Sequence, residues 1–181
     1  MGLDMYLSKK TYVKKWSFQN EDETFEVSVK KGGVTYPFIK PERVSYITEE
    51  IAYWRKANQI HGWFCANCEE IIPEVKYNVS REDLENLLDT CKKVIEMLDK
   101  SKKKTKKVVV GWSGGEQMFE DVEVYDEEDI LELLPPTQGF FFGSDTIDEW
   151  YRQNIEETIK VLEEELSIDD NSSEYSYYAS W

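Results

Sequence analysis

The chain of 181 residues carries 37 acidic and 22 basic side chains, a net charge of −15. Its hydrophobic content of 40% and aromatic content of 14% exclude a disordered chain and fit one folded domain over residues 1–181. The negative charge argues against a nucleic-acid partner, because counterion release needs Lys and Arg on the binding face. No stretch approaches the roughly 18 apolar residues of a membrane span and no basic leader precedes an apolar run, so we expect no membrane partner and a cytoplasmic location.

Both ends of the chain alternate apolar and polar residues, which predicts strands at 3–7 and 175–181 that can pair with each other. Segments 24–30 and 34–39 flank Gly32 and Gly33 and predict a β-hairpin, with Pro37 placing the second strand at an edge. Segment 44–47 does not distinguish strand from loop.

The remaining elements are mostly helical. Thr48 can cap a helix over 48–68, and Ser80 with Asp83 forms a capping-box pattern that opens a second helix through Leu98. Segments 108–112 and 122–125 predict a second hairpin, 127–134 a short helix ended by Pro135, and 146–166 a third long helix. Without regular β-α alternation, we expect an α+β fold: a single domain with three long helices and one short helix on a mixed or antiparallel sheet that includes the terminal strands.

The predicted helix at 48–68 holds most of the recognition chemistry. Four apolar residues recur at helical spacing and form a core face: Tyr53, Ala57, Ile60 and Phe64. A second face, about 110° away, collects Trp54, Arg55, Asn58 and His61. Arg55 could bind a phosphate and Trp54 could stack on a base, while Asn58 and His61 donate hydrogen bonds. The alternative is that these groups serve the core and its backbone.

A second candidate segment lies before the third long helix. Phe140, Phe141 and Phe142 stand between two glycines and are too apolar for an uncovered loop, so they either stack on a ligand or plug the core. Asp148 and Tyr151 follow in the first turns of the helix, where an acid favours the positive end of the dipole and a capping role.

Metal and catalytic patterns are weak. His61, Cys65, Cys68 and Cys91 have the right count for zinc but not the paired spacing of a structural site, so we expect no metal. A single histidine without a partnered nucleophile motif predicts no triad, and we expect no catalytic residues and no cofactor.

The clusters of acidic residues are compatible with a second function, imitation of DNA. Acids cluster at 116–132 and 145–170, which would suit a DNA mimic, although a negative surface also serves solubility alone. The five lysines of 102–107 interrupt this pattern and are typical of a solvated loop.

Several strings together resemble an uncharacterised family encoded in bacterial and bacteriophage genomes: MGLDMYL at 1–7, YWRKANQIHGWF at 53–64, GFFFG at 139–143, DEWY at 148–151 and the terminal SW. The resemblance implies a phage or prophage setting and no particular activity. It also implies that 102–125 is an inserted lysine-rich loop and hairpin. Finally, it implies that one shared site contains Trp54, Arg55, Asn58, His61, the phenylalanine loop and Tyr151.

We therefore expect a non-enzymatic, phage-type protein that binds and sequesters a small anionic, nucleotide-like ligand, such as a cyclic nucleotide signal of host antiviral defence. Its expected ligand-binding residues are Trp54, Arg55, Asn58, His61, Phe140, Phe141, Phe142, Asp148 and Tyr151. One alternative is an acidic inhibitor or DNA mimic that binds a host protein. Another is a nucleotide-processing enzyme with His61 as acid or base and Asp148 as its partner. A homo-oligomer is compatible with each hypothesis.

Overall fold

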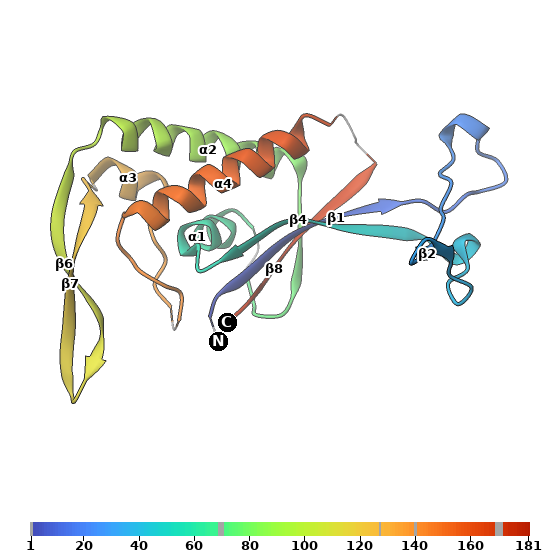
Figure 1. The fold of residues 1–181 in the computed structure, drawn as a ribbon. Helices are drawn as coiled ribbons and strands as arrows, with labels where there is room; N and C mark the ends of the chain where they lie inside the picture. Colours follow the sequence, from blue (N-terminus) through green and yellow to red (C-terminus); the bar gives the residue numbers. More distant parts are fainter. Residues whose placement is uncertain (1, 69–70, 127, 140, 169–171) are drawn as a thin grey trace.

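The two ends of the chain lie side by side at the centre of a four-stranded antiparallel sheet (Figure 1). The computed structural model describes residues 2–68, 71–126, 128–139, 141–168 and 172–181. The strands of this sheet, in spatial order, are β4 (Tyr46–Arg55), β1 (Asp4–Tyr12), β8 (Ser173–Ser180) and β5 (Lys76–Val79). Met5 of β1 stands opposite Trp54 and Ala179, and the predicted pairing of the two terminal strands is confirmed.

One face of this sheet is covered by helices. Alternate residues of β1 are buried, beginning with Met5 and Leu7, and they join one hydrophobic cluster with α2 (Arg81–Lys100) and α4 (Glu149–Leu166). Figure 1 shows α2 and α4 running side by side, with α1 (Asn58–Asn67) beneath them. Burial of each large apolar side chain contributes about 1.5–3 kcal/mol, so this cluster is the main stabilising element. The predicted α+β class is confirmed.

The ends of the long helices follow local rules. Ser80 and Asp83 form the predicted capping box: the Ser80 hydroxyl accepts from the Asp83 N–H at 3.0 Å, and the Asp83 carboxylate accepts from the Ser80 N–H at 2.9 Å. The helix predicted at 146–166 begins only at Glu149, because Asp148 occupies its N-cap. The short helix predicted at 127–134 is α3 (Glu128–Leu133), which ends before Pro135; residue 127 lies outside the described residues.

The prediction of one helix over 48–68 is wrong in its first half. Residues 46–55 form β4, and Thr48 lies in this strand instead of capping a helix. The segment is rich in β-branched and aromatic residues, which favour strands, and β1 supplies a partner along its whole length. Tyr53 and Trp54 consequently point to opposite sides of a strand, and the expected helical faces that joined them to Asn58 and His61 do not exist.

A buried ion pair ties the sheet to α4. The Lys9 ammonium lies 2.9 Å from a carboxylate oxygen of Glu165, and both side chains are less than one tenth exposed. The Tyr175 hydroxyl donates to the same oxygen at 2.7 Å. Burial, followed by this hydrogen bond, raises the pKa of Tyr175 to about 12. The cluster joins β1, α4 and β8.

Two segments project from the body in Figure 1. The first, residues 14–45, is called the arm. The hairpin predicted around Gly32 and Gly33 is present, but its antiparallel strands β2 (Lys30–Lys31) and β3 (Val34–Thr35) have two residues each instead of the predicted 24–30 and 34–39. The arm also contains the short 3-10 helices η1 (Glu21–Glu23) and η2 (Pro41–Arg43). The second is the hairpin of β6 (Lys103–Ser113) and β7 (Glu116–Tyr125).

The β6–β7 hairpin is longer than predicted. Lysines that the sequence placed in a solvated loop lie in β6 from Lys103 onward, because pairing with β7 continues to Tyr125. Lys107 stands opposite Asp121, whereas Lys104 and Lys106 stand opposite valines of β7. Along the described part of the chain, no helix is long and apolar enough to cross a membrane.

Candidate functional site

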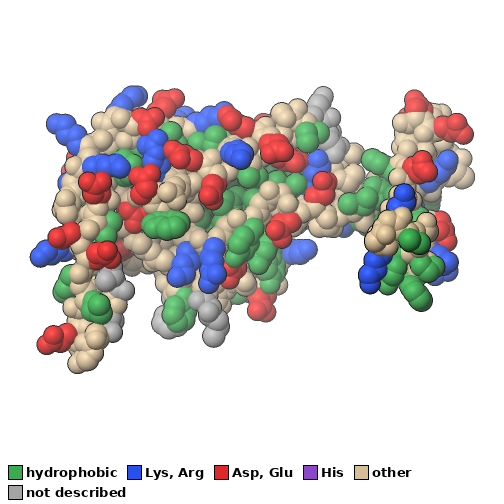
Figure 2. All heavy atoms as spheres, viewed as in Figure 1, with side chains coloured by type: hydrophobic (Ala, Val, Ile, Leu, Met, Phe, Trp, Pro, Cys, Tyr) green, Lys and Arg blue, Asp and Glu red, His purple; other side chains and the backbone are tan. Residues whose placement is uncertain are grey.

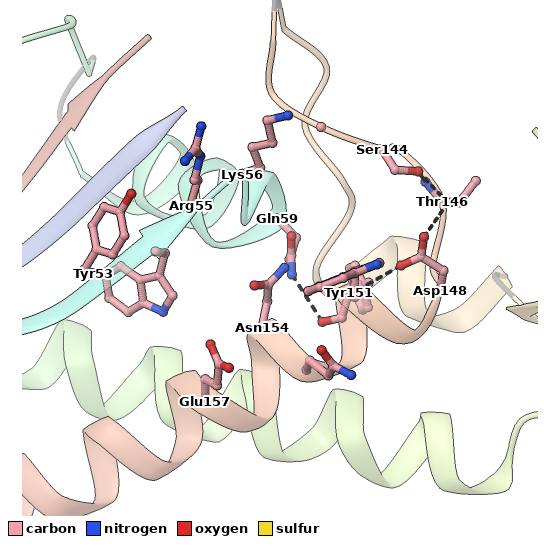
Figure 3. A pocket seen from close by; sticks show the side chains of 14 residues that line it. Tyr53, Arg55, Lys56, Gln59, Ser144, Thr146, Asp148, Tyr151, Asn154 and Glu157 are labelled. Carbon is pink, nitrogen blue, oxygen red and sulfur yellow. Dashed lines mark hydrogen bonds between the residues drawn. The ribbon is translucent and has the colours of Figure 1, made fainter. Parts of the chain in front are cut away.

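A cavity of about 650 Å³ lies between the end of β4 and the first turns of α4. Its walls come from four neighbouring pieces of chain: the end of β4, the start of α1, the loop before α4, and α4 itself (Figure 3). The lining residues are Tyr53, Trp54, Arg55, Lys56, Gln59, Gly143, Ser144, Thr146, Asp148, Trp150, Tyr151, Gln153, Asn154 and Glu157. The volume falls within the range of about 300–1,000 Å³ that is usual for small-molecule sites.

Two adjacent cations form one side of the cavity. Arg55 is the last residue of β4, and Lys56 turns the chain toward α1 with a left-handed φ of 59°. Figure 3 shows both side chains pointing to the same side of the site. Among the described residues neither forms an ion pair; Asp4, the cross-strand neighbour of Arg55, instead accepts a hydrogen bond from the Tyr53 hydroxyl at 2.6 Å. That hydrogen bond raises the pKa of Tyr53.

The aliphatic part of the Lys56 side chain packs closely against the backbone of Gly2 and Gly143. A Cβ added at Gly143 would lie 3.1 Å from the Lys56 Cβ, and one added at Gly2 would lie 3.3 Å from its Cε. Gly143 also has a φ of 103°, which L side chains rarely adopt, so only glycine fits here. The aliphatic stem is thus packed between two glycines while the ammonium is left at the surface.

The loop that forms the cavity wall is fixed by its own hydrogen bonds. The Ser144 hydroxyl bonds to the Thr146 hydroxyl, and the Thr146 hydroxyl donates to the Asp148 carboxylate at 3.1 Å. The other Asp148 oxygen accepts from the Tyr151 N–H at 3.0 Å, which caps α4. Asn58 anchors the loop from α1, since its amide donates to the Ser144 carbonyl at 2.7 Å. The wall is therefore set before any ligand arrives.

Amides and a carboxylate face the cations from across the cavity. Gln59 is buried and donates to the Tyr151 carbonyl at 3.3 Å, which leaves its own carbonyl oxygen as an acceptor. Asn154 and Glu157 lie one turn apart on α4, and Figure 3 shows them on the opposite side from Arg55 and Lys56. Among the described residues, the side chains of Asn154 and Glu157 have no hydrogen bond or ion pair. The cavity is therefore positive at one end and accepts hydrogen bonds at the other.

The aromatic side chains of the lining differ in accessibility. Trp54 is only 3% exposed, and its indole N–H donates to the Thr158 hydroxyl at 2.9 Å, so it forms a wall. Trp150 is 74% exposed and Tyr53 is 47% exposed. These two rings, and not Trp54, expose surface on which a flat group could stack, although the Tyr53 ring also packs against the Tyr6 ring at a centroid distance of 5.1 Å.

His61 lies elsewhere, in an aromatic cluster outside the cavity lining. Its Nδ1 is 2.8 Å from the Tyr177 hydroxyl, and its ring contacts those of Phe142 and Trp181 at centroid distances of 5.2 and 5.1 Å. Burial lowers the pKa of His61 to about 4. The imidazole is thus a neutral part of the core at neutral pH.

The described part of the chain contains no group of three or more His, Cys, Asp or Glu side chains that could hold a metal ion. His61 Nε2 and the Cys65 sulfur are 3.5 Å apart, but Cys91 is fully buried in the core and burial raises its pKa to about 12. A thiol with so high a pKa resists the deprotonation that zinc binding requires.

The aromatic loop contributes to the core more than to the cavity. Phe142 is buried against His61 and Trp181, as the core-plug alternative expected. Phe141 is half exposed and is not part of the cavity lining, and Phe140 lies outside the described residues.

The structure thus brings part of the predicted site together. Four of the residues expected to bind a ligand line the cavity: Trp54, Arg55, Asp148 and Tyr151. Asn58, His61 and Phe142 support the surrounding core and loop. Sequence reasoning missed Gln59, Asn154 and Glu157 as lining residues. The last two recur with Trp150 at helical spacing on α4, but that spacing does not reveal that this flank meets the end of β4.

Comparisons with protein-family models, with curated proteins and with solved structures found no match to this chain.

Proposed function

We propose that this chain is a non-enzymatic binding protein that holds a small anionic, nucleotide-like ligand in the cavity between β4 and α4. The observation that carries the proposal is the polarity of the cavity: two cations lie at one end and hydrogen-bond acceptors at the other, and among the described residues these cations have no ion pair. A nucleotide has the matching polarity, since its phosphate is anionic and its base carries N–H donors.

Arg55 and Lys56 would bind the phosphate. The guanidinium group can donate two parallel hydrogen bonds to phosphate oxygens, and the ammonium adds a second positive charge beside it. The first N–H groups of α1, which have no acceptor within the helix, begin two residues beyond Lys56 at Asn58. Their positive partial charge favours an anion at the same end.

Asn154 and Glu157 would read the base. A carboxylate accepts hydrogen bonds only, and an amide both accepts and donates, so this pair suits a base edge with an exocyclic amino group. Tyr53 and Trp150 would flank the ring, because exposed aromatic faces stack on any base.

Binding without turnover fits the groups present. One Asp148 oxygen accepts a hydrogen bond from the Thr146 hydroxyl, and the other accepts one from the Tyr151 N–H. The Ser144 and Thr146 hydroxyls form a hydrogen bond with each other. His61, the residue on which an enzymatic hypothesis depends, does not line the cavity. In a phage or prophage setting, such a protein would sequester a nucleotide signal of host antiviral defence in the host cytoplasm.

The alternative of an acidic inhibitor or DNA mimic has less support. Residues 116–125 form β7, in which Asp121 stands opposite Lys107 of β6. Lys103 and Lys104 pair with Glu149 and Asp126. These cations interrupt the continuous negative surface that imitation of a phosphate backbone needs.

Thermal unfolding against a panel of mononucleotides, cyclic mononucleotides and cyclic dinucleotides tests the proposal. A ligand at 100 times its dissociation constant adds about 2.7 kcal/mol of stability, which raises the Tm of a chain of this size by about 5–10 °C. Arg55→Ala should abolish most of this shift, and Lys160→Ala, which removes an exposed cation outside the cavity, should leave it intact.

A second variant tests the base end. Glu157→Gln should reduce any preference for adenine nucleotides over the matching hypoxanthine nucleotides. Of the two bases, only adenine has an exocyclic amino group that can donate a hydrogen bond to the carboxylate. No stabilisation by any member of the panel, with folding verified, would contradict the proposal for these ligands.

A further inference from the structure

The arm, residues 14–45, is built without a core of its own. None of its residues is buried; Val13, which follows the end of β1, is the last buried residue before the arm. Its closure relies on few backbone contacts, such as the Val13 N–H donating to the Ser45 carbonyl at 3.0 Å and the Tyr36 N–H donating to the Val29 carbonyl at 2.9 Å. Two-residue strands and short 3-10 turns do not offset the conformational entropy of ordering so many residues.

Large apolar side chains nevertheless gather on this arm. Phe18 and Phe38 are 81% and 82% exposed. Four further side chains are also exposed there: Trp16, Phe25, Val34 and Ile39. Figure 2 shows hydrophobic side chains grouped on the lower part of the arm, with basic side chains around them. An apolar surface of this kind, on a segment that projects from the body, is characteristic of an interface.

The charges of the arm divide into two halves. Its first half, residues 14–26, holds four acids and two lysines, a net charge of −2. Its second half, residues 27–43, holds three lysines, one arginine and one acid, a net charge of +3. Exposed aromatic or aliphatic side chains occur in both halves, with Phe18 in the acidic half and Phe38 in the basic half. The arm is thus a short dipole with an apolar surface along it.

This division favours a second copy of the same chain as the partner. In a two-fold interface the same patch of both copies lies face to face. When the two arms run antiparallel, the acidic half of each arm faces the basic half of the other. A nucleic acid or an anionic lipid surface would meet the acidic half with repulsion. The rest of the chain carries a net charge of −16, so two bodies repel, and the nearly neutral arm, at the far end of the molecule, is where two copies can approach.

We propose that the arm is a dimerisation element: two copies pack their arms antiparallel about a two-fold axis, with Phe18 and Phe38 in the centre of the interface and the opposite halves paired by charge. This contact keeps the acidic bodies apart and leaves the cavity at β4 and α4 of each copy open.

Sedimentation velocity from low to high micromolar concentration tests the proposal. The wild-type chain should sediment as a species of twice the 21.4 kDa chain mass. Phe18→Asp with Phe38→Asp should weaken the dimer by at least about a hundred-fold, because each central aromatic occurs twice in a symmetric interface. Met118→Asp with Phe119→Asp makes the same chemical change at exposed positions of the β6–β7 hairpin and should leave the dimer unchanged.

A charge exchange tests the antiparallel arrangement itself. Lys30→Glu with Lys31→Glu changes the basic half from +3 to −1, and Glu21→Lys with Glu23→Lys changes the acidic half from −2 to +2. Each double variant alone should dimerise about ten-fold or more weakly, because both pairs of facing halves now repel. An equimolar mixture of the two should form a heterodimer, because opposite charges face each other again.

Far-UV circular dichroism and urea unfolding of each variant separate loss of association from loss of folding. A wild-type chain that stays monomeric throughout the concentration range would overturn the proposal. So would a dimer that survives the Phe18 and Phe38 substitutions in folded protein. Two charge variants that stay monomeric when mixed would overturn the antiparallel arrangement.

Discussion

The pH dependence of stability follows from the position of the only histidine in the chain. His61 is 3% exposed, and burial lowers its pKa from an ordinary 6.5 to about 4. Between these values the unfolded chain binds a proton that the folded protein excludes. Acidification therefore favours the unfolded state, and the stability contributed by the neutral imidazole is lost as the pH falls from 6.5 toward 4.

The size of this effect can be calculated. A pKa difference of this size is worth about 3 kcal/mol in full, and linkage places about 2 kcal/mol of the loss between pH 7 and pH 5. Most carboxylates are still ionised at pH 5, so this interval isolates the imidazole. His61→Gln removes the titrating group; the variant should lose about 2 kcal/mol less than wild type over the same interval.

Urea unfolding at the two pH values measures the stability, and an NMR titration of the imidazole Cε1–H signal measures the pKa directly. One histidine gives one signal, which leaves no ambiguity of assignment. A measured pKa near 6.5, or equal losses of stability in wild type and His61→Gln, would refute the reasoning, because the imidazole would then be accessible to water in the folded protein.

Two further predictions concern packing. Glu165→Gln should lower the free energy of unfolding by about 3 kcal/mol in urea unfolding, because it removes a carboxylate from a buried ion pair, whereas Glu163→Gln, in an exposed pair on the same helix, should change it by less than about 0.5 kcal/mol. Equal effects of the two would contradict the burial of the pair. Gly62→Ala should lower the Tm, because a Cβ there would clash with the Thr137 hydroxyl and lie 3.2 Å from the Thr137 Cβ, while Gly111→Ala, which has no atom within 4 Å, should be tolerated.

Capping residues and apolar periodicity predicted the elements whose bounds depend on nearby residues alone. The capping box at Ser80 and the apolar periodicity through Leu98 define α2 almost to the residue, and the alternation of apolar residues from Leu3 identifies β1. These signals lie within the segment they describe. The hairpin at 108–125 was also visible but was predicted too short, because lysines are poor indicators of a strand.

The residues in the first half of the predicted helix at 48–68 do not by themselves show that this segment is a strand. Apolar residues at Tyr53, Ala57, Ile60 and Phe64 fit a helical period, although Tyr53 belongs to β4 and the other three to the turn and α1. The strand forms because β1, whose paired residues lie 34 to 51 positions away in the sequence, pairs along β4 from Tyr46 to Arg55. Short apolar patterns leave helix and strand ambiguous until the non-local partner is known.

The same limit applied to the candidate site. The density of cationic, amide and aromatic groups near Arg55 directed the prediction to the end of β4, where Arg55 lines the cavity. Asn154 and Glu157 come from a helix about 100 residues later, and nothing in their own segment indicates that they face Arg55. His61 illustrates the reverse: its sequence neighbours suggested a place in the site, but it is packed in the core beside Tyr177, where burial lowers its pKa to about 4.

The central claim, that the cavity between β4 and α4 binds a nucleotide, is tested most directly by mapping binding on ¹⁵N-labelled protein with the indole N–H signals of the six tryptophans as reporters. Addition of a cyclic dinucleotide, or of another nucleotide that stabilises the protein, should shift the Trp150 indole and the backbone signals of residues 53–59 and 143–157. The Trp16 indole on the arm should not move. Shifts confined to the arm or to the β6–β7 hairpin, with the signals at the cavity unchanged, would contradict the account.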